Sequence, residues 1–423
     1  MRRQYWRFFW PLSLMGVAML LARQFQNGAL ARYGDAGREI AVFAIASSVL
    51  GLFVAPLAFV PMMSNVLARS RRGHRICLEC LLAACAILTA PVAFLAFARA
   101  GRATVAAIFA IEGGVLDSVI RYLRFLLPVV LLAGLRNHYT GLLVQAKRTG
   151  AVTLLNLLSL ATVIGVLVGG FHAGWPAVRT LATAEIAASV LHLAATWLCV
   201  RRWVVFADDA DAPLSYREAF SFFWPIATTG AMFAISRPIL YALVGRGPNP
   251  EPVIAALRVS FDFGMMFQNP MNQFRHLFAT FGCDDLPGVR RFMIRAMFVL
   301  ATTMFIVAAT PLSLWLYRDL LGVGGDVLRM ARQATLVLCL VPVAMALRNY
   351  FHGQSLVDRK TTSLAVGSVL RNLAIAAAAG LLLAVGWLNH VTAAGVLVLG
   401  FFSEALGVIA HRARLAALPV SDA

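Results

Sequence analysis

The sequence predicts an all-α polytopic membrane protein, with twelve transmembrane helices arranged as two six-helix bundles. Three observations favour this fold class. Of the 423 residues, 60% are hydrophobic and only 13% are charged, which is about half the charged share of an ordinary soluble domain. Apolar windows long enough to cross a bilayer recur along the chain. Motifs of the first half recur in the same order in the second half.

The charge balance limits the class of function. The formal net charge is +18, from 37 Lys and Arg against 19 Asp and Glu, and Lys147 and Lys360 are the only lysines. A basic groove for nucleic acid needs a polar, solvated surface, which so apolar a chain does not supply. We therefore expect no nucleic-acid partner. The same composition argues against a soluble enzyme and against a disordered chain.

The twelve expected spans account for most of the chain and leave no room for a sizeable soluble domain. They are 8–31, 40–67, 76–98, 123–146, 150–172, 176–200, 219–245, 252–280, 291–316, 332–355, 362–386 and 389–411. Basic residues at loops and span ends favour one side, which includes Arg2, Arg3 and Arg7, and this side is expected to be cytoplasmic. We expect both termini in the cytoplasm and the protein in the inner (cytoplasmic) membrane.

The two halves of the chain resemble copies of one unit. The recurring elements are Phe8–Pro11 with Phe222–Pro225, Arg23 with Arg237, Pro56 with Pro270, Leu135–Asn137 with Leu347–Asn349, Gly141 with Gly353, Lys147–Thr149 with Arg359–Thr361, and Gly174-Trp175 with Gly386-Trp387. Each copy holds an even number of spans, so both cross the membrane in the same sense. We predict an N-terminal bundle over 1–205, a cytoplasmic linker over 206–216, a C-terminal bundle over 217–415 and a flexible tail over 416–423.

No convincing catalytic or metal-binding pattern is present in the sequence. Cys77 and Cys80 form a CxxC near His74, but no second pair completes a metal site. We interpret the cysteines as helix-packing residues and expect neither a metal nor a cofactor. Signatures of zinc proteases, serine hydrolases and phosphate-binding loops are not found, so we expect no enzyme activity.

Arginines inside the expected spans give the main indication of function. They are Arg23, Arg136, Arg237, Arg258, Arg275, Arg348 and Arg371, and the acids at comparable depth are Glu185, Asp262 and Glu404. A cation at the centre of a membrane helix costs roughly 2.5–3.5 kcal/mol. These side chains must therefore be paired, reach the headgroups or face a wet cavity, and three acids cannot neutralise seven cations. The excess favours an anionic passenger, because arginine binds carboxylate and phosphate with two hydrogen bonds.

The duplication groups most of the substrate-binding candidates. These are Arg23, Arg136, Asn137, Arg237, Arg348, Asn349 and Arg371. Helix rise places Arg23 and Arg237 in the outer half of the membrane, and Arg136 and Arg348 in the inner half. The alternative is that the inner pair reaches cytoplasmic headgroups or caps helix ends, and that the outer pair is purely structural.

The eighth span carries a polar stripe on one helical face. It comprises Arg258, Asp262, Asn269, Asn272, Gln273 and His276. Such a stripe should face a cavity or another helix, which adds Asn269 and Asn272 to the substrate-binding candidates. Pro270, like Pro56 in the second span, removes a backbone hydrogen bond and is a candidate hinge, or else a packing residue.

A third group of residues is expected to couple transport to an ion or to balance charge. It comprises Arg258, Asp262, Glu185, Glu404 and His276. Arg258 and Asp262 are four residues apart on a helix and can pair. The acids and the histidine are candidates for proton coupling, and the alternative is that each acid only neutralises an arginine.

Several of these residues occur in motifs of a known family. Ser221–Ile226 (SFFWPI) followed by Ile235–Ile239 (ISRPI) resembles the seventh span of the progressive ankylosis (ANKH) family, where the wording is SFWWPL followed by ISRPI. Arg348, Gly353 and Arg359–Thr361 are similar to that family's R-x4-G-x5-K-K-T. Ser368–Arg371 and Gly400–Glu404 match further patterns. The resemblance covers mainly the C-terminal half, and the N-terminal half agrees in organisation.

The resemblance implies a fold and a function. The family resembles the MOP superfamily of MATE-like exporters, which have twelve spans in two bundles around a central cavity. It implies export of organic or phosphate anions such as citrate, ATP or pyrophosphate, with Arg237, Arg348, Arg371 and Glu404 as the carried-over residues. The short chain and tight loops are typical of a bacterial-type member, which leaves the particular anion open.

Together these observations predict an alternating-access transporter that exports small organic or phosphate anions through a central arginine-lined cavity. The alternative is a flippase for an anionic lipid-linked precursor, which would share both the fold and a cationic cavity. The expected partners are the anion, the lipid bilayer, and protons or another coupling ion. We expect a monomer.

Overall fold

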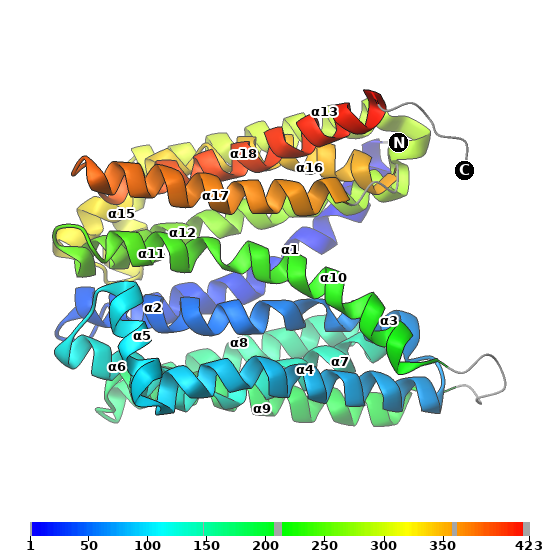
Figure 1. The fold of residues 1–423 in the computed structure, drawn as a ribbon, viewed down its shortest axis with the longest axis horizontal. Coiled ribbons are helices and arrows are strands. Elements are labelled where there is room, and N and C mark those ends of the chain that lie inside the picture. The colour runs from blue at the N-terminus through cyan, green and yellow to red at the C-terminus, as the bar shows by residue number, and fades with distance from the viewer. Residues whose placement is uncertain (1, 147, 207–213, 358–361, 418–423) are drawn as a thin grey trace. The chain divides into compact units, whose positions relative to one another are not determined.

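The computed structural model describes residues 2–146, 148–206, 214–357 and 362–417, and the regular structure in these ranges is helical (Figure 1). Nine helices in the described chain are long and apolar enough to cross a membrane. They are Ala36–Leu67, Arg71–Phe97, Gly113–Gln145, Gly150–His172, Ala177–Trp203, Asp285–Ala309, Gly325–Gln354, Ala365–Ala384 and His390–Ala413. The predicted all-α membrane class is confirmed, and the count of twelve spans stays a prediction.

The chain divides into two compact units. The C-terminal unit comprises Met1–Ile40 together with Ile239–Ala423, and the N-terminal unit comprises Ala41–Pro238. These units differ from the predicted halves, because the first helix belongs with the C-terminal residues. The predicted linker, 206–216, falls largely on residues 207–213, which lie outside the described chain, as do residues 418–423 of the predicted tail.

The N-terminal unit contains nine whole helical elements and most of α2. They are α2 (Ala36–Val54), η1 (Ala55–Phe59), α3 (Val60–Leu67), α4 (Arg71–Phe97), α5 (Arg99–Phe109), α6 (Gly113–Leu126), α7 (Pro128–Gln145), α8 (Thr149–His172), α9 (Ala177–Trp203) and α10 (Tyr216–Ala234). The Ser70 side chain caps α4, and Ser215 with Glu218 forms a capping box on α10. Arg99 and Arg102, which fall between the expected spans 76–98 and 123–146, lie on the short helix α5.

The C-terminal unit contains the first helix and the chain from Ile239 onward. Its elements are α1 (Arg2–Leu30), α12 (Pro250–Asn272), α13 (Phe274–Ala309), α14 (Leu312–Leu314), η2 (Trp315–Leu320), α15 (Gly325–Leu338), α16 (Val341–Val357), α17 (Thr362–Ala384) and α18 (His390–Ala417), and α11 (Ser236–Val244) joins it to the N-terminal unit. Phe9 of α1 packs against Phe274 and Phe292 of α13, with ring centroids 4.6 and 5.5 Å apart. These contacts explain why α1 groups with the second half of the chain.

Helix α13 contains a break that separates the eighth predicted span from the ninth. The backbone of Asp285 is not helical, with φ of −147° and ψ of 65°. Its carboxylate accepts hydrogen bonds from the Gly288 N–H at 2.9 Å and from the Tyr5 hydroxyl at 2.7 Å. Asp285 therefore caps the second part of α13 and ties it to the start of α1.

Pro56 marks a break between α2 and α3 in the N-terminal unit. In a regular helix the Leu57 carbonyl would accept from the N–H of residue 61, but Pro61 has none. The Leu57 carbonyl instead accepts from the Val60 N–H and from Nδ2 of Asn137 on α7, the latter at 2.8 Å. The asparagine thus satisfies a carbonyl at a depth where water is scarce.

The C-terminal unit repeats this arrangement at Pro270, near the end of α12. Nδ2 of Asn349 on α16 donates to the Met271 carbonyl at 2.7 Å. Leu57 and Met271 are related by the offset that relates the two prolines. The duplication read from the sequence is therefore visible as the same side-chain contact at the same helix break in each unit.

Two repeat-related glycines allow neighbouring helices to approach closely. A Cβ atom on Gly141 of α7 would lie 2.5 Å from the Pro61 carbonyl oxygen of α3, and one on Gly353 of α16 would lie 2.6 Å from Cβ of Phe278. Small residues at such crossings are the usual way to bring membrane helices together. The close approach also brings Asn137 and Asn349 within reach of the broken helices.

Substitution of Gly141 by alanine should destabilise the protein by about 1–3 kcal/mol, because the added methyl group meets backbone that cannot rotate away. The matched control is Gly165→Ala on α8, where a Cβ meets nothing within 4 Å. Alanine is a better helix former than glycine, so the control should be neutral or slightly stabilising. Thermal unfolding in detergent distinguishes them, and equal stability of the two variants would contradict the proposed close packing.

Candidate functional site

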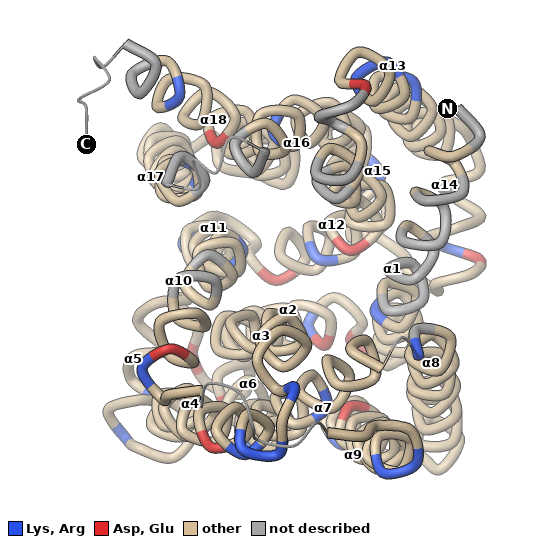
Figure 2. Tube along the Cα trace, turned by 90° about the vertical axis from the view of Figure 1, so that its right-hand side faces the viewer, with Lys and Arg blue, Asp and Glu red and all other residues tan. Residues whose placement is uncertain are grey.

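Glu404 on α18 lies at the centre of a buried charged cluster, which we call the Glu404 cluster (Arg348, His352, Ser368, Arg371 and Glu404). Figure 2 shows α16, α17 and α18 side by side in the C-terminal unit. Nε of Arg348 lies 2.8 Å from Oε1 of Glu404, and Nη1 of Arg371 lies 2.7 Å from Oε2. All three side chains are almost fully buried. One carboxylate therefore binds two guanidinium groups, and the cluster keeps an excess of one positive charge.

Two further side chains surround the Glu404 carboxylate. Nε2 of His352 lies 3.6 Å from Oε1, and the Ser368 hydroxyl donates to the same oxygen at 3.4 Å. Oε1 thus faces three polar side chains, those of Arg348, His352 and Ser368.

Glycines set the distance between α17 and α18 at this cluster. A Cβ atom on Gly400, one turn before Glu404, would lie 2.6 Å from Cγ1 of Ile375 and 3.2 Å from Cγ of Arg371. A Cβ atom on Gly367 would lie 2.9 Å from the Glu404 carbonyl oxygen. The small residues let α17 approach α18 until Arg371 reaches the carboxylate.

A second charged cluster, the Asp262 cluster (Arg23, Asn27, Arg258 and Asp262), joins α1 to α12. Nη1 of Arg23 lies 3.7 Å from Oδ1 of Asp262, and Nη2 of Arg258 lies 3.9 Å from Oδ2. Asn27 accepts from Nε of Arg258 at 2.8 Å and donates to Asp262 at 3.3 Å. Again two arginines share one carboxylate. Arg258 and Asp262 are buried, whereas the Arg23 side chain is 49% exposed and can meet a ligand.

The polar stripe predicted on the eighth span contacts both clusters. Its first members, Arg258 and Asp262, belong to the Asp262 cluster. Further along, Oδ1 of Asn272 accepts from Nη1 of Arg348 at 3.3 Å, which connects α12 to the Glu404 cluster. Asn269 is half-buried on α12. The side chain of His276 lies outside the described part of the chain.

The remaining predicted residues belong to the N-terminal unit. Arg136 on α7 is half-buried and interacts electrostatically with Glu185 on α9. Arg237, at the start of α11, is also half-buried. The repeat-related pairs are thus divided, since Arg23 and Arg348 lie in the C-terminal unit, and Arg136 and Arg237 lie in the N-terminal unit.

Three residues of the clusters were not among the predicted candidates. Asn27 lies four residues after Arg23, and His352 lies four residues after Arg348, so helical spacing was a usable signal for both. Ser368 is three residues before Arg371, the other arginine that binds Glu404. Polar residues one turn from a membrane arginine are therefore good candidates for contacts with the carboxylate that this arginine binds.

A further polar chain in the N-terminal unit also escaped the sequence reasoning. The Ser64 hydroxyl lies 2.7 Å from Nδ1 of His138, and Nε2 of His138 lies 3.1 Å from Nδ1 of His74. The chain links α3, α7 and α4. Within the described residues, no group of three His, Cys, Asp or Glu side chains is placed to hold a metal ion.

Replacement of Glu404 by glutamine should destabilise the protein strongly, by about 3–5 kcal/mol, because two buried guanidinium groups lose their shared counter-charge. Asp319→Asn is the matched control, since it removes a carboxylate from an exposed pair with Arg318 in η2. The control should be nearly neutral. Thermal unfolding in detergent measures both, and a Glu404 variant as stable as the control would show that the arginines do not depend on this carboxylate.

Solved structures provide a comparison for this arrangement of helices. The chain is similar to a multidrug resistance MATE family transporter of the MOP superfamily in an inward-facing conformation, with 16% identity, coverage of 97% of this chain and 96% of that chain, and a TM-score of 0.69. It is also similar to the lipid II flippase MurJ in an inward closed conformation, with 13% identity, coverage of 96% and 88%, and a TM-score of 0.68. A eukaryotic MATE transporter gives 14% identity, 99% and 96% coverage, and a TM-score of 0.67.

These likenesses confirm the predicted MATE-like fold. The model of the progressive ankylosis protein (ANKH) family matches residues 2–285, which is more than half of the chain. The match includes the SFFWPI and ISRPI motifs. It also extends over the whole N-terminal unit, where the resemblance seen in the sequence lay in the organisation more than in individual motifs. The chain therefore belongs to the progressive ankylosis protein family, and it has the fold of the MOP superfamily.

Proposed function

We propose that this protein is an alternating-access membrane transporter that exports small organic or phosphate anions, of the citrate, pyrophosphate or nucleotide type, through a central arginine-lined cavity. The observation that carries the proposal is the pair of clusters in the C-terminal unit, each with two arginines and one carboxylate. Each cluster is electrically balanced only when one more negative charge arrives. The family and the fold support the same function.

The acids of the two clusters act in this proposal as internal counter-ions. Glu404 holds Arg348 and Arg371 while no substrate is bound, which avoids the cost of unpaired buried cations. An incoming carboxylate or phosphate competes with Glu404 for the same N–H donors. In the proposal, the anion favours the conformation in which it contacts the arginines, because Glu404 alone stabilises that conformation less well. In the proposal, Arg23 also contacts the anion, because its side chain is partly exposed.

The proline breaks provide the proposed points of bending. At Pro56 and Pro270 the helix is already interrupted, and the Asn137 and Asn349 side chains satisfy carbonyls at these breaks. A helix bending there exposes fewer unsatisfied backbone groups to the lipid than one bending elsewhere. In the proposal, rocking about these points exposes the arginines alternately to the two sides. Arg136, Arg237, Asn269 and Asn272 are further substrate-binding residues in the proposal.

The proposed setting is the cytoplasmic membrane, with both termini in the cytoplasm and a monomer as the functional form. The larger set of basic loop residues supports this orientation. Protons or another ion are the proposed coupling partners, and Glu404, Asp262, Glu185 and His276 are the titratable groups available for the coupling.

A flippase for an anionic lipid-linked precursor is the second candidate. It is favoured by the likeness to MurJ, whose helices superpose on most of this chain. The two candidates differ in the part of the substrate that lies outside the charged clusters, since a lipid-linked precursor also needs an apolar path for its tail.

Transport by purified protein in liposomes tests the proposal. Vesicles that contain the protein should take up or release labelled citrate or pyrophosphate, and Arg237→Ala should reduce the rate at least tenfold. Arg237 is half-buried and outside both clusters, so the variant is expected to fold. Arg237→Lys tests the need for bidentate binding, and should retain only part of the activity. Arg69→Ala, at an exposed position, serves as the control and should transport normally.

Three outcomes would count against the proposal. Full transport by Arg237→Ala would remove that residue from the site. Flipping of a fluorescent polyprenyl pyrophosphate without any transport of free pyrophosphate would favour the flippase. A rate that does not respond to a pH gradient or to a Na⁺ gradient would contradict coupling by either ion.

A further inference from the structure

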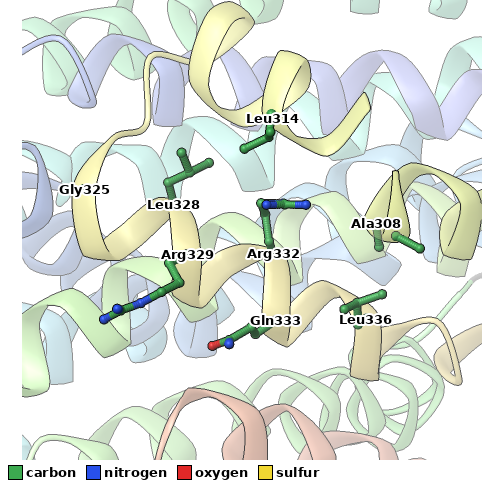
Figure 3. A pocket seen from close by; sticks show the side chains of 9 residues that line it. Ala308, Leu314, Gly325, Leu328, Arg329, Arg332, Gln333 and Leu336 are labelled. Atoms are coloured by element: carbon green, nitrogen blue, oxygen red, sulfur yellow. The ribbon is translucent and has the colours of Figure 1, made fainter. Parts of the chain in front are cut away.

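A pocket of about 320 Å³ lies in the C-terminal unit and is shown in Figure 3, and no residue of the Glu404 cluster lines it. It forms where α13 ends, α14 turns and α15 begins. Its walls include Ala308, Leu314, Leu328, Arg329, Arg332 and Leu336. The pocket therefore combines an apolar floor with two cations, and it plays no part in the transport mechanism proposed above.

The two arginines are available to an anion. Nε of Arg332 donates to the Ser313 hydroxyl at 2.8 Å, which orients the guanidinium, and within the described residues Arg332 has no carboxylate partner. Arg329 pairs with Asp326 at 2.9 Å, but both side chains are more than two-thirds exposed. An ion pair so exposed is weak, and a phosphate can replace the carboxylate. With two arginines and one acid, the pocket has a positive balance.

The position of the arginines corresponds to the depth of lipid headgroups. Helix α15 opens the apolar span Gly325–Gln354, and the span Asp285–Ala309 ends at the same pocket. Arg332 lies seven residues into its helix, which is about 10 Å from the start. Trp315 on the adjoining η2 is exposed, as is usual for tryptophan at a membrane interface.

The residues that follow Arg332 form an apolar column in the direction of the membrane interior. Leu336 lies one helical turn after Arg332 on α15, and Leu340 lies in the short turn that joins α15 to α16. They are 39% and 52% exposed. Figure 3 shows Leu328, Arg332 and Leu336 in succession along α15. A cation at headgroup depth with exposed leucines below it matches a ligand that has a charged head and an apolar tail.

We propose that this pocket binds an anionic phospholipid, with its phosphate between Arg329 and Arg332 and an acyl chain along Leu336 and Leu340. A small soluble anion would use the arginines but not the leucine column. A zwitterionic lipid would use the column, but its choline group would lie against two cations. The combination of the two features selects an anionic lipid.

Lipid binding to purified, detergent-solubilised protein tests this proposal. Phosphatidylglycerol, phosphatidylcholine and inorganic phosphate are titrated separately, with bound lipid counted by native mass spectrometry and the melting temperature recorded. Phosphatidylglycerol should bind at least tenfold more tightly than phosphatidylcholine. The double variant Arg329→Gln/Arg332→Gln should lose that tenfold preference. Arg318→Gln, which removes an exposed arginine from the neighbouring η2, is the control and should keep it.

A second variant keeps the test informative if loss of the Arg332–Ser313 hydrogen bond disturbs folding. Leu336→Ser leaves both arginines in place at an exposed position, and should weaken phosphatidylglycerol several-fold. Equal binding of the two lipids, or unchanged preference in the folded double variant, would overturn the proposal. Stabilisation by inorganic phosphate as large as that by phosphatidylglycerol would identify a soluble-anion site instead, and would also overturn it.

Discussion

The ion pairs of Glu404 with Arg348 and Arg371 join three helices at a depth where neither charge could remain alone. A buried guanidinium without a partner is among the most expensive groups that a membrane protein can contain. The surrounding structure meets this constraint at several levels. Gly400 and Gly367 bring α17 against α18, Arg348 reaches the carboxylate from α16, and Asn272 of α12 supports that arginine from the other side. Removing the carboxylate would therefore affect four helices and not only one contact.

The duplication has kept the backbone contacts of the two units and changed their charges. Asn137 and Asn349 make the same hydrogen bond to equivalent carbonyls at equivalent proline breaks. At the same offset of 212 residues, however, the position of Glu404 corresponds to His192. The N-terminal unit thus has a buried histidine where the C-terminal unit has a carboxylate. Backbone satisfaction is a requirement of every membrane helix, so both copies retain it. In the proposed function the charged clusters serve one site, so they need to be present only once.

The two clusters also suggest why the interior keeps a positive excess. A fully neutral interior would hold the helices together equally well but would offer nothing to an anion. An interior with many unpaired cations would not be stable. One carboxylate for two arginines lies between these limits, because each guanidinium has a partner and each cluster still attracts one more negative charge.

Composition and periodicity by themselves determined the membrane class, the approximate positions of the apolar helices and the duplication, because these depend on burial in lipid and on local hydrogen bonding. They also predicted one ion pair, Arg258 with Asp262, because residues four apart on a helix are neighbours wherever that helix packs. Which arginines bind Glu404, the contribution of Asn27 and the grouping of α1 with the second half of the chain were decided only by the tertiary structure. Pairs between helices depend on the angle and distance at which the helices cross, and small residues such as Gly400 set these through contacts between segments distant in sequence.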